Sequence, residues 1–285
     1  DLAGIPEDDI ASFKEAAQAA GQEGYRITLQ VPHYLAVMQY AQNRVLRETL
    51  YKAYVTRASE LDFDGRFNNN NVMRHIVELR ETEARLLDFK NYGEVSLTTK
   101  MADTPQEVIA FLRDLAKRSL PQAKNDVKEV KQFARDTLKI DDPQSWDLPF
   151  ASEKLRQARY SYSDQEVKQY FTLPNVFNGL FGLVQTLFGI RIVPDTAPVW
   201  HPDVQFFRIE NDKGEKVAQF YMDLYARSNK RGGAWMDNDR TRNRLYGQLQ
   251  TPVAYLVCNF AKPVGDKPAL LTHDDVLTLF HEFGH

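Results

Sequence analysis

Residues 271–285 read LTHDDVLTLFHEFGH, and this stretch predicts a helix that begins after Thr272. Thr272 suits the N-cap position, because its hydroxyl can accept a hydrogen bond from a free N–H group of the first turn. Asp275 occupies the third helical position, where an acidic side chain can complete a capping box. At about 100° per residue, the remaining side chains divide into an apolar face, with Val276, Leu279, Phe280 and Phe283, and a polar face, with Asp274, Thr278, His281 and His285.

His281, Glu282 and His285 form the pattern H-E-x-x-H. Histidines at positions i and i+4 lie one turn apart on the same helix face, so two ring nitrogens can converge on one Zn²⁺ at about 2.0–2.1 Å. The pattern predicts His281 and His285 as zinc ligands and Glu282 as the general base that takes a proton from a zinc-bound water. The alternative is a chance pair of core or solvated histidines. The two opposed faces and the capped start favour the zinc site.

Before this helix, the chain changes from helical to strand-like patterns near residue 195. VWHPDVQFFRIE (199–210), VAQFYMDLYA (217–226) and TPVAYLVCNF (251–260) are typical of strands, with a turn at NDKGEK (211–216) and a glycine-containing loop at RSNKRGGAWM (227–236). β-branched and aromatic residues between turn signals are the usual mark of a strand. We expect a small β-sheet that packs against the terminal helix.

The first two-thirds of the chain has mainly helical patterns. We expect a short strand at YRITLQV (25–31), one long amphipathic helix over 33–57, a helix from Thr104 to about residue 138, and a buried helix within 176–193 that ends near Gly189. The predicted fold class is therefore mainly α with a small β-sheet. We divide the chain into a helical region, residues 1–195, and the start of a catalytic region, residues 196–285.

A calcium loop is excluded at residues 62–73. Asp62 and Asp64 precede Gly65 in a loop rich in asparagine, which resembles the start of an EF-hand. That motif needs its glycine at the sixth position and a glutamate at the twelfth. Here the glycine is misplaced and the twelfth residue is Met73, so we expect no calcium there.

Composition limits the classes of protein to which this chain can belong. The 285 residues carry a net charge of −3, and 43% of them are hydrophobic, so a core of ordinary size can form and no basic field attracts nucleic acid or anionic membrane. Cys258 is the only cysteine, which excludes an internal disulfide and a cysteine-based zinc site. Its apolar neighbours predict a buried, inert thiol.

Several stretches together resemble the thimet-oligopeptidase family of zinc peptidases, in particular its bacterial branch. They are HEFGH (281–285), FYMDLYARSNKRGGAWMD (220–237), WHPDVQFF (200–207), PVAYLVCNF (252–260), EGYRITLQVPHYLAVM (23–38) and LYKAYVTRASE (50–60). The resemblance covers essentially the whole chain. It implies a zincin-like, mainly helical cytoplasmic metalloendopeptidase that hydrolyses short oligopeptides. His281 and His285 match the family's zinc ligands, and Glu282 matches its general base.

The same resemblance implies that parts of the family's site are not in this sequence. A third zinc ligand, a glutamate on a following helix, and residues that stabilise the oxyanion would come after His285. We therefore expect this chain to be an internal piece of a longer enzyme, inactive by itself, with one Zn²⁺ bound only in the full-length protein. The resemblance also implies that a strand such as PVAYLVCNF lies along the cleft and pairs with substrate. We expect a monomer without nucleic-acid or membrane partners.

Two alternatives remain open at this stage. One uses the same chemistry in a dipeptidyl carboxypeptidase, for which Arg227, Lys230 and Arg231 could bind the free carboxylate of a peptide. These three residues could equally form a solvated basic loop. The other alternative is a non-catalytic, helical peptide-binding module in which H-E-x-x-H is a relic.

Overall fold

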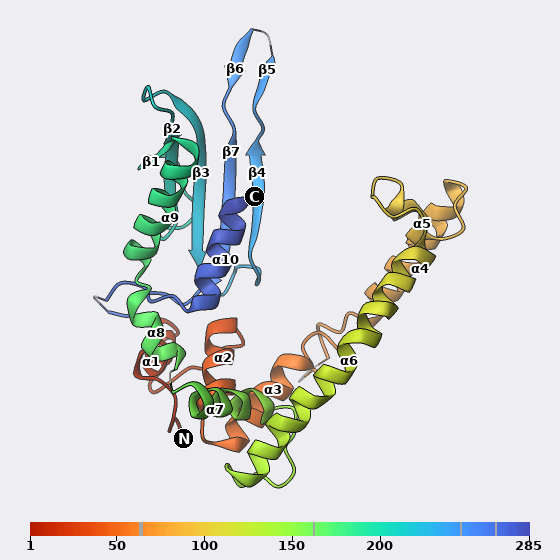
Figure 1. The fold of residues 1–285 in the computed structure, drawn as a ribbon, viewed down its shortest axis with the longest axis vertical. Helices are drawn as coiled ribbons and strands as arrows, with labels where there is room; N and C mark the ends of the chain where they lie inside the picture. Colours follow the sequence, from red (N-terminus) through yellow and green to blue (C-terminus); the bar gives the residue numbers. More distant parts are fainter. Residues whose placement is uncertain (63–64, 162, 246, 266) are drawn as a thin grey trace. The chain divides into compact units, whose positions relative to one another are not determined.

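The computed structural model describes residues 1–285 except 63, 64, 162, 246 and 266. Two compact units make up the chain: unit 1 contains residues 1–43 and 156–285, and unit 2 contains residues 44–155. The helices are α1 (Glu7–Ala19), α2 (Val31–Tyr40), α3 (Arg44–Val55), α4 (Asn70–Leu86), α5 (Tyr92–Leu97), α6 (Pro105–Asp136), α7 (Leu148–Tyr160), α8 (Asp164–Val167), the 3₁₀ helix η1 (Lys168–Tyr170), α9 (Leu173–Phe188) and α10 (His273–Gly284). The fold is mainly α with a small mixed sheet, as the sequence predicted (Figure 1).

The sheet lies in unit 1 and has five strands in the order β1-β2-β3-β7-β4. Its strands are β1 (Arg191–Pro194), β2 (Gln205–Glu210), β3 (Lys216–Tyr225), β4 (Trp235–Arg240) and β7 (Val253–Phe260); a separate pair, β5 (Asn243–Leu245) and β6 (Gln248–Gln250), continues the β4–β7 hairpin. β3 and β7 pair in parallel, and the other neighbours are antiparallel. The sequence predicted β2, β3 and β7. It missed β1 and β4, which are the two edge strands.

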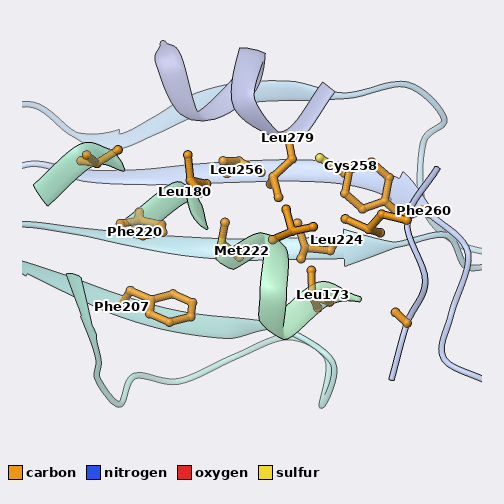
Figure 2. Close-up of a cluster of buried hydrophobic side chains, with 14 residues drawn as sticks. Leu173, Leu180, Phe207, Phe220, Met222, Leu224, Leu256, Cys258, Phe260 and Leu279 are labelled. Carbon is orange, nitrogen blue, oxygen red and sulfur yellow. The ribbon is translucent and has the colours of Figure 1, made fainter. Parts of the chain in front are cut away.

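One face of the sheet is covered by α9 and α10 and forms the main core (Figure 2). Alternate residues of each strand point to this face, because side chains in a strand alternate between the two sides. Leu279 of α10 is fully buried beside Leu256 and Cys258 of β7 and Met222 of β3. Burial of one leucine side chain contributes about 1.5–3 kcal/mol, so this contact holds the terminal helix against the sheet.

The predicted helix within 176–193 is confirmed as α9, which begins at Leu173. Thr172 caps its start and accepts a hydrogen bond from the N–H of Asn175. Gly189 ends it in the left-handed conformation, with φ +64°, which a residue without Cβ adopts at little cost.

The strand predicted at residues 25–31 was wrong. No β-ladder forms at these positions in the described structure, and α2 begins at Val31 with Pro32 in its first turn. The N–H of Arg26 donates to the carbonyl of Phe13 (2.9 Å), and the N–H of Thr28 donates to Nδ1 of His33 (3.2 Å). These tertiary hydrogen bonds use the backbone groups that a strand partner would need.

The single helix predicted over residues 33–57 is in fact two helices, α2 and α3. Residues 41–43 between them are not helical, and Ala41 has an extended backbone and a fully buried side chain. The N–H of Gln42 donates to the carbonyl of Ala3 (2.9 Å), so a contact with the start of the chain replaces a helical hydrogen bond.

Unit 2 consists of helices and their connections. Asp147 is fully buried and accepts charged hydrogen bonds from Arg44 and Arg47, both at 2.8 Å, which link α3 to the segment before α7. Thr104 caps α6 through the N–H of Glu107, as predicted. Within the excluded calcium loop, Asp64 lies outside the described residues. None of the described helices is both long and apolar enough to span a bilayer.

Candidate functional site

The start of α10 has the capping arrangement that the sequence predicted. The hydroxyl of Thr272 accepts a hydrogen bond from the N–H of Asp275 (3.1 Å), and the Asp275 carboxylate accepts one from the N–H of Thr272 (2.9 Å). Asp274 and Asp275 also place negative charge in the first turn, where it stabilises the helix dipole. Local sequence therefore determines where this helix begins.

The two faces of α10 are also as predicted. Leu279 is fully buried, while Val276, Phe280 and Phe283 pack against the core as partly buried residues. The ring of Phe283 meets Phe220 of β3 edge-on, with centroids 5.6 Å apart. The opposite face is left to the solvent.

His281 and His285 lie on that solvent face, and their side chains converge. The two Nε2 atoms are 3.2 Å apart, and the rings are nearly perpendicular at 87°. Two ligand nitrogens at about 2.0–2.1 Å from a tetrahedral Zn²⁺ lie about 3.3 Å apart. In the absence of a metal, the same distance fits a hydrogen bond between a protonated and an unprotonated Nε2. The pair thus fits the first two ligands of one metal ion.

A wider ligand set does not form within the part of the chain that the structure describes, because no group of three or more His, Cys, Asp or Glu side chains is arranged around one point. Two protein ligands are fewer than the three that catalytic zinc sites use. His273, although exposed at the start of α10, contacts Phe171 and not the histidine pair.

Glu282 differs from its histidine neighbours because its side chain is turned toward the sheet. It is 9% exposed, and no hydrogen bond or ion pair to a described residue engages its carboxylate. Burial raises the pKa of the nearby Cys258 thiol to about 12, and the negative charge of Glu282 acts in the same direction. Cys258 is thus the buried, inert thiol that the sequence predicted.

The family model for peptidase family M3 matches residues 37–285. The chain belongs to peptidase family M3. Among its relatives, oligopeptidase A of Escherichia coli is 49% identical over 288 residues, a probable cytosolic oligopeptidase A of Arabidopsis thaliana is 42% identical over 301, and a dipeptidyl carboxypeptidase of Salmonella typhimurium is 36% identical over 287. Each match covers 100% of this chain and 42% of the relative, so the chain spans about two-fifths of the length of these proteins.

In this M3 chain, the strand PVAYLVCNF, which was predicted to pair with substrate, lies inside the sheet and not at its edge. β7, which contains PVAYLVCNF, is the fourth of five strands and is hydrogen-bonded on one side to β3 and on the other to β4. Both of its edges are paired over Val253–Val257, so a substrate strand cannot add there. β4 is the edge strand beside it, and α10 contacts both strands. β4 is therefore the strand next to the H-E-x-x-H helix with an edge on which a peptide backbone could pair.

The basic loop after β3 contains a network that the sequence analysis did not predict. The buried carboxylate of Asp223 accepts two hydrogen bonds from Arg227 (2.6 and 2.7 Å), one from Lys230 (2.9 Å) and one from the indole of Trp200 (2.9 Å). Burial by itself would raise the pKa of Asp223. The three donors outweigh burial and lower that pKa to about 2.

For Arg227 and Lys230, this network differs from both roles considered for the basic loop, because the two side chains form buried or half-buried ion pairs instead of a solvated loop or a free carboxylate site. Lys230 is 4% exposed, and its ammonium also donates to the carbonyls of Asp223 and Tyr225. Arg227 is occupied by the same carboxylate. Two of the three candidate carboxylate binders are thus used to fold the M3 chain, and the spacing D-x-x-x-R-x-x-K within residues 223–230 was the available signal.

Two of the remaining histidines, His33 and His201, have structural positions in the M3 chain. His33 is buried between Ser12 and Thr28, and burial lowers its pKa to about 4. His201 accepts a hydrogen bond from the N–H of Asp203 (3.2 Å), which stabilises a turn beside Trp200. His75 is exposed on α4.

Proposed function

We propose that this chain carries part of the active site of a zinc-dependent metalloendopeptidase that hydrolyses short oligopeptides. The observation that carries the proposal is the 3.2 Å separation of the two Nε2 atoms of His281 and His285 in a chain of peptidase family M3. The names of the relatives, oligopeptidase A among them, support peptides as substrates. Residues 1–195 would then be the helical region, and residues 196–285 the start of the catalytic region.

In this proposal, His281 and His285 would hold the zinc through Nε2. When bound, zinc supplies Lewis acidity, which makes a water molecule more acidic and polarises a peptide carbonyl. Glu282 would serve as the general base toward the attacking water, since its carboxylate has no hydrogen-bond partner among the described residues. β4 holds the peptide backbone by pairing along its edge.

Two of the three cations considered for a dipeptidyl carboxypeptidase, Arg227 and Lys230, are bonded within the basic loop and the third, Arg231, is exposed; the engaged pair supports the endopeptidase. An exopeptidase of that kind needs a cation for the terminal carboxylate of its substrate. Arg227 and Lys230 are both bonded to Asp223, so neither is available without breaking a buried ion pair. We propose a cytoplasmic, monomeric enzyme.

The test compares this 285-residue chain with the protein expressed from its complete gene. Zinc content is measured by mass spectrometry, and activity by cleavage of a quenched oligopeptide. We expect the complete protein to hold about one zinc and to cleave, and this chain, with two ligands, to hold zinc weakly and not to cleave. Glu282→Gln should keep the metal and lose cleavage, His281→Ala should lose both, and the control His273→Ala should lose neither.

The same experiment addresses the non-catalytic alternative. If the complete protein binds oligopeptides but neither holds zinc nor cleaves them, H-E-x-x-H is a relic and the chain belongs to a peptide-binding module. Release of dipeptides from the C-terminus of the substrate, seen by mass spectrometry of the products, would instead indicate the carboxypeptidase.

A further inference from the structure

A cavity of about 160 Å³ lies in unit 1 beside the first turn of α10. Its walls come from α1, α2, α8, η1 and the segment that joins β7 to α10. Asp274 and Asp275 line it, whereas His281 and Glu282 do not. Asp275 precedes His281 by six residues, about 9 Å along a helix, so this cavity is separate from the proposed zinc site.

Lys168 provides the unusual feature of the cavity. Its side chain is only 9% exposed, yet its ammonium has no hydrogen bond, and no ion pair within 4 Å, to any residue that the structure describes. Among the described residues, the ammonium nitrogen of Lys168 is not fully enclosed by protein, so it reaches space that solvent can enter. Lys168 lines the cavity, so its ammonium offers the anionic group of a ligand a positive charge that no described side chain pairs with directly.

Asp9 of α1 faces the same space. Burial raises the pKa of its carboxyl to about 6, and the positive charge of Lys168 acts in the opposite direction. No hydrogen bond from a described residue reaches the Asp9 carboxyl. An unpaired acid and an unpaired ammonium therefore line one cavity without forming a direct ion pair, so a ligand with both charges can neutralise both.

The charges around the cavity limit the class of ligand. Asp9, Asp164, Asp274 and Asp275 place four carboxyl groups in its walls; Asp164 is paired with Arg156, and Asp275 accepts a hydrogen bond from the N–H of Thr272. These acidic surroundings disfavour a simple anion, and the Lys168 ammonium disfavours a metal ion. A molecule with both charges satisfies both groups. The remaining wall is apolar, with Leu35, Ala36 and Leu270.

We propose that this cavity binds a small zwitterion, a free α-amino acid with an apolar side chain. Its carboxylate contacts Lys168, its ammonium contacts Asp9, and its side chain lies on the apolar wall. One water-sized atom needs about 10–15 Å³ of such volume, so the cavity has room for the nine heavy atoms of leucine. The proposal does not rest on peptidase activity, because none of its residues belongs to the proposed zinc site.

The test measures binding of L-leucine to this chain by calorimetry and by the shift in melting temperature. Two analogues dissect the zwitterion: leucinamide lacks the carboxylate, and 4-methylpentanoate lacks the ammonium. We expect leucine to bind saturably and to raise the melting temperature, and each analogue to bind at least about ten-fold more weakly. Comparable binding of inorganic phosphate would show an anion site and overturn the proposal.

Lys168→Met should abolish the preference for leucine over leucinamide. This variant should fold, because it removes a buried charge that has no direct partner, and circular dichroism checks this. The control is Lys267→Met, which alters an exposed lysine at 75% side-chain exposure and should leave leucine binding unchanged. If wild type shows no saturable binding of leucine, or if Lys168→Met binds it as wild type does, the proposal is wrong.

Discussion

His33 provides a quantitative test of the packing between α1 and α2. The N–H of Thr28 donates to Nδ1, which must therefore be unprotonated, and Nε2 is left to donate to the hydroxyl of Ser12 (3.1 Å). The ring also packs edge-on against Phe13, with centroids 4.8 Å apart. Protonation would put a charge in a buried place and a hydrogen on Nδ1, facing the Thr28 donor. The neutral ring is thus the form that the folded state needs.

The magnitude follows from the pKa. Burial lowers the pKa of His33 from 6.5 to about 4, so at a pH between these values the unfolded chain binds a proton that the folded chain does not. Stability from this group is therefore full above pH 6.5 and falls as the pH drops toward 4. The shift corresponds to a loss of about 3 kcal/mol in the free energy of unfolding.

The perturbation is His33→Asn, whose amide oxygen can still accept from Thr28 but does not titrate. The free energy of unfolding is measured by urea denaturation from about pH 7 to about pH 4. At about pH 7, we expect the variant to be about 2 kcal/mol less stable than wild type, because it loses the contacts of the His33 ring with Phe13 and Ser12. As the pH falls, this difference should shrink by about 3 kcal/mol and reverse its sign.

The difference between the two proteins is the decisive quantity, because Asp9 titrates in the same range with the opposite sign. His75→Asn, which alters an exposed histidine on α4, serves as the control and should not reproduce the pH-dependent change in stability that His33→Asn shows. A difference between wild type and His33→Asn that stays constant with pH would refute the reasoning.

Three other changes have predicted outcomes. The pKa of Asp9 is raised to about 6, so its stabilising effect is full below pH 4 and lost above pH 6. As the pH rises between these values, the free energy of unfolding of Asp9→Asn should increase by about 3 kcal/mol relative to wild type, as measured by urea denaturation. Asp223→Asn leaves the buried Lys230 ammonium without its counter-charge and should cost about 3–5 kcal/mol in thermal or urea unfolding, whereas Asp237→Asn on the exposed part of β4 should change little. Thr272→Ala removes the cap of α10 and should cost about 1 kcal/mol, and Thr272→Ser should restore it.

Some of the candidate site could be predicted from the sequence because it depends on one helix. The cap at Thr272, the buried Leu279 and the convergence of His281 and His285 all follow from helix periodicity and from residues within two turns of one another. The ion pairs of Asp223 could also have been predicted from the sequence, because its main partners lie four and seven residues further along the chain.

Other features depended on which distant segments meet. The alternating pattern of residues 25–31 predicts a strand, but the backbone of Thr28 is bonded to His33 instead. The backbones of β7 and β4 carry the same donors and acceptors. Because β7 pairs with β3 on its other side, β4 is left at the edge of the sheet with one unpaired side.

By itself, the sequence determined the family of this protein, its mainly helical class and the paired histidines of the H-E-x-x-H helix. Only the tertiary structure decided that β4 is the edge strand, that Glu282 is turned toward the sheet and that Lys168 and Asp9 line one cavity. The physical reason is the range of the interactions. Helix periodicity acts between neighbours in the chain, whereas burial, sheet order and unpaired charge depend on which distant segments fill the space around a residue.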